Sequence, residues 1–205
     1  MCCRYYILPK SVEWDPIREG AEHALVMRRF LEAGAALVSS GEVRPTDVVP
    51  VLATDRRGGK SCFPMRWGFR LEGPKPTLLI NARAESAAEK PTFREAWASH
   101  RCAVPASGYY EWEHSPENPR GKGTKYAIAD AGKELLWLCG LYRIENGLPV
   151  FVILTREPGP SLLRLHDRMP LILPAEAALD WIDPAVRPES LLSLAKTDLS
   201  AEKAG

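Results

Sequence analysis

Cys2 stands directly after the initiator methionine, a position that gives it chemistry the other cysteines lack. Removal of Met1 requires a small second residue, and cysteine is small. The product would carry an α-amine and a thiol on adjacent carbons, which titrate at roughly 8 and about 8.5. Both groups are then partly nucleophilic at neutral pH. Such a 1,2-aminothiol can condense with an aldehyde to a thiazolidine ring or attack an amide or ester carbonyl. The alternative is that Cys2 has no role.

Glu111 is a candidate proton carrier because of the residues beside it. If residues 108–113 form a strand, Glu111 lies on the opposite face from Tyr110 and Trp112. One interpretation is that Glu111 faces water, as most strand glutamates do. The other is that its aromatic neighbours partly desolvate the carboxylate, which favours proton transfer near neutral pH.

Asn81 and His166 are the other polar residues that could orient or protonate a reacting group. Asn81 opens the segment 81–85 after an apolar run, so it is either a helix cap or an amide directed into a cleft. In the second case Arg83 could hold a phosphate. His166 is either a proton shuttle at neutral pH or a structural or exposed histidine.

Residues 56–70 contain five cations and three aromatic residues, and no acid. Cations can follow a phosphate backbone, and aromatic rings can stack on unpaired bases. The alternative is a solvated basic hairpin whose aromatic side chains belong to the core. Over the whole chain the formal net charge is only +1, so any polyanion site must come from local clustering.

The length of 205 residues and an apolar content of 45% fit one domain with a substantial core. We expect a domain over residues 2–190 and a tail over residues 191–205. The segment after Pro188 is predicted to be weakly helical and to fray. No signal peptide is apparent, and no apolar run approaches the ~18 residues of a membrane helix. The sequence therefore predicts a cytoplasmic protein.

The five cysteines are odd in number and scattered, so we expect reduced thiols rather than a disulfide framework. Neither Cys-x-x-Cys nor His-x-x-x-His occurs, and a zinc site is not expected. Free cysteines are usually buried. Cys62, Cys102 and Cys139 are therefore predicted to be core residues.

Strands outnumber helices in the predicted order of elements. A helix is expected from Pro16 to Leu31, a capping box at Thr92–Glu95 should open a short helix ending near His100, a helical turn should cover residues 159–165, and a helix should cover residues 174–181. Strands are predicted at residues 4–8, 48–53, 77–81, 101–104, 108–113, 125–129, 135–142, 149–155 and 169–173. Because these strands do not alternate regularly with helices, we predict an α+β fold with a curved, mixed or antiparallel sheet.

Several short motifs match one known family, in the same order, over about residues 2–182. They are Met1–Cys2 with Arg4, Arg66–Phe69, Asn81–Glu85, Arg101–Trp112, Gly140–Tyr142, Leu154–Thr155 and His166–Pro170. In these motifs the chain resembles the SOS response-associated peptidase (SRAP) family. Two positions depart from the family pattern: Cys3 replaces a frequent glycine, and Phe69 replaces a common leucine.

The resemblance implies a single α+β domain with a barrel-like sheet and short helices, and a protein that shields abasic sites in single-stranded DNA. Cys2 would form a thiazolidine crosslink with the ring-opened sugar. Asn81 would hold the sugar, Glu111 would move protons as the imine forms, and His166 would assist ring opening and crosslink reversal. No metal or organic cofactor is implied, because the aminothiol supplies the chemistry.

The resemblance also implies which residues contact DNA and what kind of DNA the protein binds. The residues expected to contact DNA, with the two tryptophans as stacking or wedge surfaces, are Arg4, Pro45, Arg66, Trp67, Arg83, Arg94, Trp112 and Thr155. The expected partner is single-stranded DNA with abasic sites, bound by a monomer that is associated with the nucleoid when on DNA.

Two other functions remain open from the sequence. One is a thiol peptidase or amidase that uses Cys2 as an N-terminal nucleophile. The other is a non-covalent single-strand binding module, against which the near-zero net charge argues because such binders usually need more cations.

Overall fold

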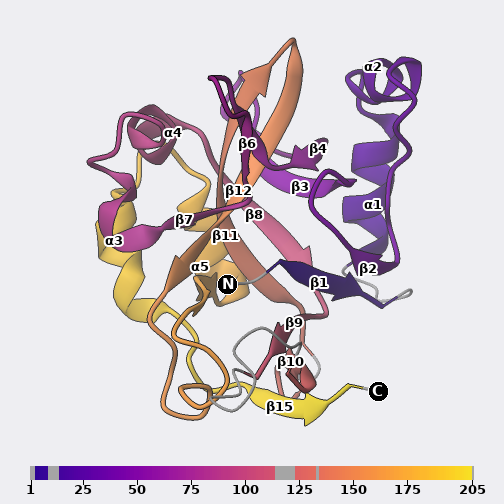
Figure 1. The fold of residues 1–205 in the computed structure, drawn as a ribbon. Helices are drawn as coiled ribbons and strands as arrows, with labels where there is room; N and C mark the ends of the chain where they lie inside the picture. Colours follow the sequence, from indigo (N-terminus) through magenta and orange to yellow (C-terminus); the bar gives the residue numbers. More distant parts are fainter. Residues whose placement is uncertain (1–2, 9–13, 114–122, 133, 205) are drawn as a thin grey trace.

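Five strands close into a barrel at the centre of the protein (Figure 1). The computed structural model describes residues 3–8, 14–113, 123–132 and 134–204. In order around the barrel, the strands are β12 (Leu148–Arg156), β4 (Lys60–Trp67), β3 (Val48–Thr54), β8 (Arg101–Ala106) and β11 (Leu136–Glu145). β11 pairs in turn with β12 and closes the ring, and only the β12–β4 pair of this ring is parallel.

A second sheet carries the N-terminal strand. Its order is β15 (Ser200–Lys203), β10 (Lys125–Ala129), β9 (Gly108–Trp112), β1 (Arg4–Ile7) and β2 (Gly41–Val43), with all neighbours antiparallel. Tyr5 and Tyr109 of this sheet are buried in the same core cluster as the side chains that point into the barrel, such as Trp67 and Phe151. This sheet therefore packs against the barrel through one face.

Helices cover the barrel on two sides (Figure 1). On one side lie α1 (Trp14–His23) and α2 (Met27–Glu32). On the other lie α3 (Ala84–Ala87), α4 (Arg94–Ser99), α5 (Ala175–Trp181) and the 3₁₀ helix η1 (Pro188–Leu194). The outward side chains of the barrel strands, such as Leu52, Val152 and Leu154, form a second core cluster with this second group.

The single helix expected from Pro16 to Leu31 is wrong. Two helices cover this region, and Leu31, expected to be on the apolar stripe, is exposed. The chain leaves helical geometry after His23, and a second helix starts at Met27. Phe30 is buried, whereas Leu31 is 59% exposed, because the break changes the direction of the apolar stripe. The expected capping box is also wrong: α4 begins after Phe93, and no side-chain bond caps it.

Two predicted strands are each divided, since they pair with two different neighbours. Residues 77–81 split into β6 (Thr77–Leu79), which pairs with β5 (Phe69–Leu71), and β7 (Asn81–Arg83), which runs parallel to β12. Residues 169–173 split into β13 (Met169–Pro170) on β12 and β14 (Ile172–Leu173) on β11. The sequence did not predict β2, β4, β5 or β15. The other predicted strands are present with boundaries shifted by a few residues.

The segment after Pro188 does not fray as expected. It forms η1 and then β15, which pairs with β10 over Ser200–Lys203. Leu191 and Leu199 are buried in the two core clusters, so apolar burial holds this segment on the domain.

The α+β prediction with a barrel-like mixed sheet is confirmed. Cys102 and Cys139 are buried, as predicted, and burial raises the pKa of both thiols, whereas Cys62 is half-buried. Within the described ranges, no helix has the length and apolar character needed to cross a membrane.

Candidate reactive site and nucleic-acid interface

The register of β1 and β9, continued by one residue, puts Cys3 opposite Glu111. Arg4 is opposite Tyr110, and Tyr5 is opposite Tyr109. Cys2 itself lies outside the described residues, but its neighbour Cys3 is described and half-buried. Burial, followed by the charge of Glu111, raises the pKa of the Cys3 thiol. The Glu111 carboxylate is therefore near enough to Cys3 for its charge to affect the thiol.

Glu111 is screened from water. Only 4% of the residue is exposed, and it shares the barrel-facing side of β9 with Tyr109. Tyr110 and Trp112 alternate with it and are half-buried on the other side of the strand. Glu111 is therefore buried rather than facing water, but the barrel side of β9 buries it and not the flanking Tyr110 and Trp112, as the sequence had suggested. A carboxylate in such surroundings interacts strongly with nearby charges and protons.

Asn81 is positioned by a short series of contacts that leads back to β1. It begins β7 and stands beside Ile153 in the parallel pairing with β12. The preceding carbonyl, that of Ile80, accepts a hydrogen bond of 2.9 Å from the Trp67 indole N–H. The Trp67 ring in turn packs on the Tyr5 ring, with centroids 5.3 Å apart. Trp67 thus fixes β7 relative to the strand that follows Cys3.

The helix-cap interpretation of Asn81 is wrong. The residue at the N-cap of α3 is Arg83, and no side-chain hydrogen bond caps that helix. Asn81 is two residues earlier, within β7, where it is half-buried. Its amide therefore does not cap α3.

His166 lies in a turn whose two ends are anchored in the barrel core. Leu165 and Met169 are each 1% exposed members of the core cluster that contains Trp67. The side chain of His166 is 12% exposed; its Nδ1 is 3.0 Å from the Arg168 backbone N–H and 2.6 Å from Asp167 Oδ1. These partners suit opposite protonation states, because unprotonated Nδ1 accepts from Arg168 and protonated Nδ1 donates to Asp167. The ring can therefore exchange a proton without losing a partner at this atom.

Arg168 joins two of the sequence motifs. Its guanidinium forms a bidentate ion pair with Glu85, at 2.9 Å from Nη1 to Oε1 and 2.7 Å from Nη2 to Oε2. Nη2 also donates to the Thr155 carbonyl at 2.7 Å. Burial would raise the pKa of Glu85, but the hydrogen bond and charge from Arg168 outweigh it and lower that pKa. The sequence analysis missed this pair, although both residues lie within the motifs it identified.

The structure leaves most of the predicted DNA contacts accessible. Arg83 and Arg94 are exposed, at the end of β7 and in α4. Pro45 is half-buried in the turn between β2 and β3. Arg4 is half-buried on β1, and Arg66 lies with its guanidinium carbon 5.5 Å from the Phe30 ring centroid, on the side of the barrel next to α2.

Two of the residues predicted to contact DNA are fully buried. Trp67 has 0% exposure inside the barrel, so it has no surface on which a base could stack. Thr155 is also 0% exposed, and its hydroxyl is 3.4 Å from the Ala82 carbonyl. Trp112 is half-buried on the outer side of β9, where its ring retains solvent contact.

The basic segment 56–70 fits the solvated-hairpin interpretation. Asp55 accepts hydrogen bonds from the backbone N–H groups of Arg57 and Gly59, which shapes the exposed tip between β3 and β4. Trp67 and Phe69, farther along the segment, are buried in the core. The cations and the rings of this segment therefore do not form one continuous binding surface.

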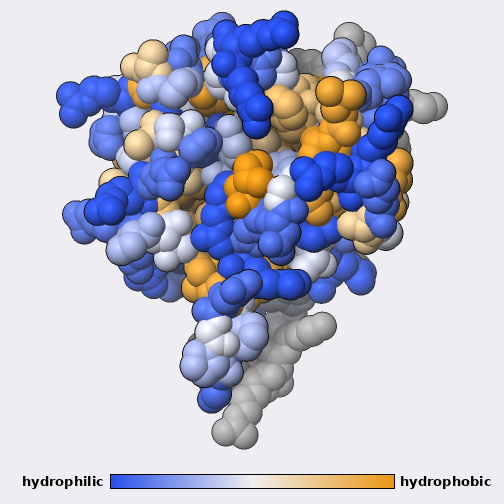
Figure 2. All heavy atoms as spheres, turned by 90° about the horizontal axis from the view of Figure 1, so that it is seen from above, coloured by the Kyte–Doolittle hydropathy of each residue, from blue (hydrophilic) through white to orange (hydrophobic). Residues whose placement is uncertain are grey.

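The surface shown in Figure 2 is mostly hydrophilic, with hydrophobic side chains in small groups between polar ones. A hollow of ≈ 430 Å³ lies between α4 and β11, lined in part by Thr92, Glu95, His100 and Tyr142. Asn81, Glu111 and His166 do not line it. The residues around the start of β1, rather than this hollow, are the candidate reactive site. Among the described side chains, no group of three or more His, Cys, Asp or Glu residues is arranged to hold a metal ion.

The chain is similar to known proteins over most of its length. The chain is 36% identical over 206 residues to the abasic site processing protein YoqW of Bacillus subtilis, covering 95% of this chain and 86% of the relative. It is 32% identical over 169 residues to the abasic site processing protein YoaM of the same organism, covering 75% and 73% of the two chains. A phage-related protein of Bordetella bronchiseptica has the same fold, with a TM-score of 0.75, 23% identity and coverage of 99% and 94%.

A model of one protein family matches nearly the whole chain, over residues 1–203. The matched range includes β1 and the buried Glu111. It also includes the motifs Asn81–Glu85 and His166–Pro170, which the Arg168–Glu85 ion pair connects. The chain therefore belongs to the SOS response associated peptidase (SRAP) family.

Proposed function

We propose that this protein processes abasic sites in single-stranded DNA by forming a covalent thiazolidine through Cys2 after removal of Met1. Membership of the SRAP family and the names of the relatives support abasic site processing. The observation that carries the crosslinking proposal is the position of Glu111, buried and next to Cys3 at the start of β1. The residue before Cys3 is the aminothiol that such a carboxylate would serve.

The proposed reaction needs no external oxidant or reductant. The abasic sugar opens from its cyclic hemiacetal to the C1 aldehyde, and its ring oxygen becomes a hydroxyl. The Cys2 amine adds to C1, and loss of one water gives an imine. The Cys2 sulfur then adds to the imine carbon while the nitrogen gains a proton, which closes the thiazolidine. Glu111 and His166 move the protons, and Asn81 orients the sugar.

The DNA strand would be held by the accessible members of the predicted set. Arg4, Arg66, Arg83 and Arg94 supply positive charge for phosphates. The outer face of Trp112 provides an aromatic surface for a base. An abasic nucleotide has no base to unstack, so it enters a site at lower cost than an intact one. The protein would work as a cytoplasmic monomer, associated with the nucleoid while on DNA.

Self-processing is the second activity that we propose, favoured by the peptidase description of the family. The Cys2 thiol would attack the Met1 carbonyl and transfer the Met1 acyl group from the Cys2 nitrogen to its sulfur. Water would then hydrolyse this thioester, which releases Met1 as the free amino acid and leaves the Cys2 amine and thiol exposed. This would be the only proteolysis. Sustained hydrolysis of a panel of peptides would instead indicate a general thiol peptidase.

A crosslinking assay on denaturing gels tests the proposal. Wild-type protein and an abasic single-stranded oligonucleotide should give a band that survives denaturation. Cys2→Ala should abolish this band, and the adjacent Cys3→Ala variant, the matched control, should retain it. Equal loss in both variants would contradict the assignment to Cys2. Unchanged DNA affinity of Cys2→Ser, with no preference for abasic strands, would indicate a non-covalent binding module.

A further inference from the structure

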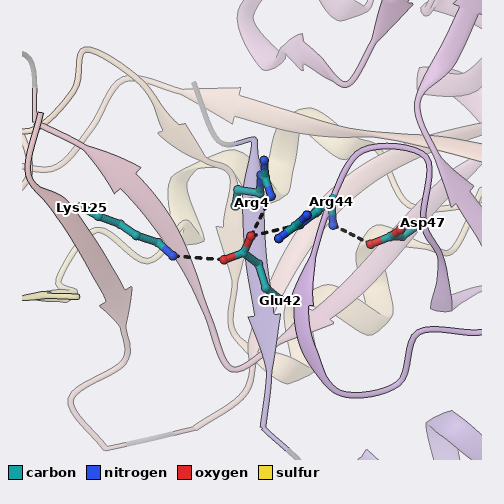
Figure 3. Close-up of polar contacts among 5 residues, drawn as sticks. All are labelled: Arg4, Glu42, Arg44, Asp47 and Lys125. Carbon is teal, nitrogen blue, oxygen red and sulfur yellow. Dashed lines mark hydrogen bonds and ion pairs between the residues drawn. The ribbon is translucent and has the colours of Figure 1, made fainter. Parts of the chain in front are cut away.

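Three cations from three different strands or turns converge on one carboxylate (Figure 3). Glu42 Oε1 accepts from Arg4 Nη1 at 2.7 Å and from Arg44 Nε at 3.2 Å, and its Oε2 is 3.1 Å from Lys125 Nζ. We call Arg4, Arg44 and Lys125 the Glu42 cluster. One carboxylate neutralises only one of the three cations. Asp47, which accepts from the Arg44 backbone N–H at 2.8 Å, is the second carboxylate among these five side chains, three of which are cations.

The cations of this cluster remain in contact with solvent. The side chains of Arg44, Arg4 and Lys125 are 63%, 31% and 26% exposed. Their pairing with Glu42 therefore holds them near one another without removing them from the surface. A diffusing anion can reach them, and it meets cations whose side-chain freedom is already reduced.

Aromatic rings lie directly beside the Glu42 cluster on the outer face of the sheet. Lys125 Nζ is 3.7 Å from the Tyr110 ring centroid and 5.8 Å from that of Trp112. The Tyr6 and Tyr110 rings are 4.9 Å apart. Proteins that bind single strands combine cations for the phosphates with aromatic rings for the bases. The outer face of β1, β9 and β10 has both.

The cluster also lies next to the proposed reactive terminus. Arg4 follows Cys3 directly, and in the β1–β9–β10 registers it is opposite Tyr110 while Lys125 is opposite Trp112. A strand whose abasic sugar is held at Cys2 would place a neighbouring phosphate within reach of this face. Cations here would therefore act on the strand close to the lesion.

We propose that Arg44 and Lys125, together with Arg4, bind a backbone phosphate of single-stranded DNA next to the abasic nucleotide, and that Glu42 gathers them in the free protein. The inference rests on the proposed function for the identity of the strand. It extends the binding surface to two cations, Arg44 and Lys125, that the sequence motifs do not contain.

Binding of an intact strand tests this site without any crosslinking. A fluorescein-labelled oligo(dT) is titrated with wild-type protein, Lys125→Met and Arg44→Ala over a range of salt concentrations, by fluorescence anisotropy. Each variant should bind about 3- to 10-fold more weakly at low salt, and the slope of log K against log salt should fall by about 0.7, the value for one phosphate contact on a single strand. Lys125→Arg should restore most of the affinity, because it keeps the charge.

Lys196→Met is the matched control. Lys196 is also paired with two carboxylates, those of Asp130 and Glu134, and is 27% exposed, close to the 26% of Lys125. This control should bind oligo(dT) within twofold of wild type, and circular dichroism should show that every variant is folded. Equal affinities and slopes for Lys125→Met, Arg44→Ala and Lys196→Met would overturn the inference, even if wild type crosslinks abasic DNA. Conversely, a wild-type protein that binds oligo(dT) through Arg44 and Lys125 but forms no crosslink would support the site and contradict the proposed function.

Discussion

Arg168 and Glu85 form a bidentate ion pair that connects the turn carrying His166 to the strand and helix that carry Asn81 and Arg83. The same guanidinium donates to the Thr155 carbonyl, so three segments meet at one side chain. A planar guanidinium can make these bonds at once, whereas an ammonium cannot reproduce the fork. The pair thus determines how two of the proposed catalytic residues are placed relative to each other.

Arg168→Lys should therefore slow crosslinking more than it weakens DNA binding. The lysine keeps the charge but loses the bidentate geometry, and we expect a roughly 10-fold lower rate at saturating abasic DNA, as misplacement of a catalytic group can cost this much or more. Arg18→Lys is the control, because Arg18 is paired with Glu22 on α1, remote in the fold from this pair. Equal crosslinking rates for the two variants would show that the Arg168–Glu85 ion pair does not position the catalytic residues.

Glu111→Gln should slow crosslink formation by about 10²-fold if the carboxylate transfers protons, which is the usual contribution of general acid–base catalysis. Glu113→Gln is the matched control, since Glu113 follows on the same side of the chain but is half-buried rather than buried. Single-turnover gel assays measure both rates. A Glu111→Gln rate close to that of Glu113→Gln would remove Glu111 from the mechanism.

His166→Ala should slow formation or reversal of the crosslink while leaving affinity for an intact strand within about twofold. The imidazole has partners for both protonation states at Nδ1, which suits a proton carrier rather than a phosphate ligand. His23→Ala, at an exposed position in α1, is the control. A loss of oligo(dT) affinity equal to the loss of rate would contradict this assignment.

Acid should destabilise the protein in part through Glu42. Burial would raise its pKa, but hydrogen bonds and charge from Lys125 and Arg4 outweigh that effect and lower the pKa below the ordinary 4.5. The stabilisation is therefore complete above about pH 4.5 and is lost as pH falls through the native pKa. For partly exposed ion pairs it amounts to at most about 1 kcal/mol. Glu42→Gln should flatten the fall of the unfolding free energy below pH 4.5, as measured by urea denaturation. A slope equal to that of wild type would contradict the lowered pKa.

Arg101 should be among the most sensitive positions for stability. It is 2% exposed and donates to the backbone carbonyls of Trp97, Ala98, Trp181, Asp183 and Val186. Arg101→Met would leave these buried or part-buried acceptors without their donor, at a cost of about 3 kcal/mol or more. Thermal denaturation measures the loss. A change below about 1 kcal/mol would show that water or a local shift replaces the guanidinium.

The sequence pattern within a single strand was enough to predict which way the side chains of that strand point. The two-residue alternation of residues 108–113 placed Glu111 on the opposite face from Tyr110 and Trp112, and the structure agrees. In residues 60–67 the same alternation separates Arg66 on the outside from Trp67 on the inside, so the cations and the buried rings of this basic segment belong to different faces of one strand.

Contacts between distant segments could not be predicted from local patterns. Glu42 pairs with residues 38 and 83 positions away, and β2 is only three residues long, too short for a periodic signal. Closure of the barrel by the parallel β12–β4 pair and the burial of Leu199 likewise depend on tertiary pairing. The sequence indicated the elements and their chemistry, and packing decided which side chains meet.

Intact mass spectrometry of the mature protein, before and after mixing with an abasic oligonucleotide, tests the central claim most directly. The account predicts a protein that has lost Met1 and carries no other modification of its amino terminus. It also predicts an adduct equal to that protein plus the oligonucleotide minus one water. A terminus that retains Met1 or is acylated, or an unblocked protein that gives no adduct, would contradict it.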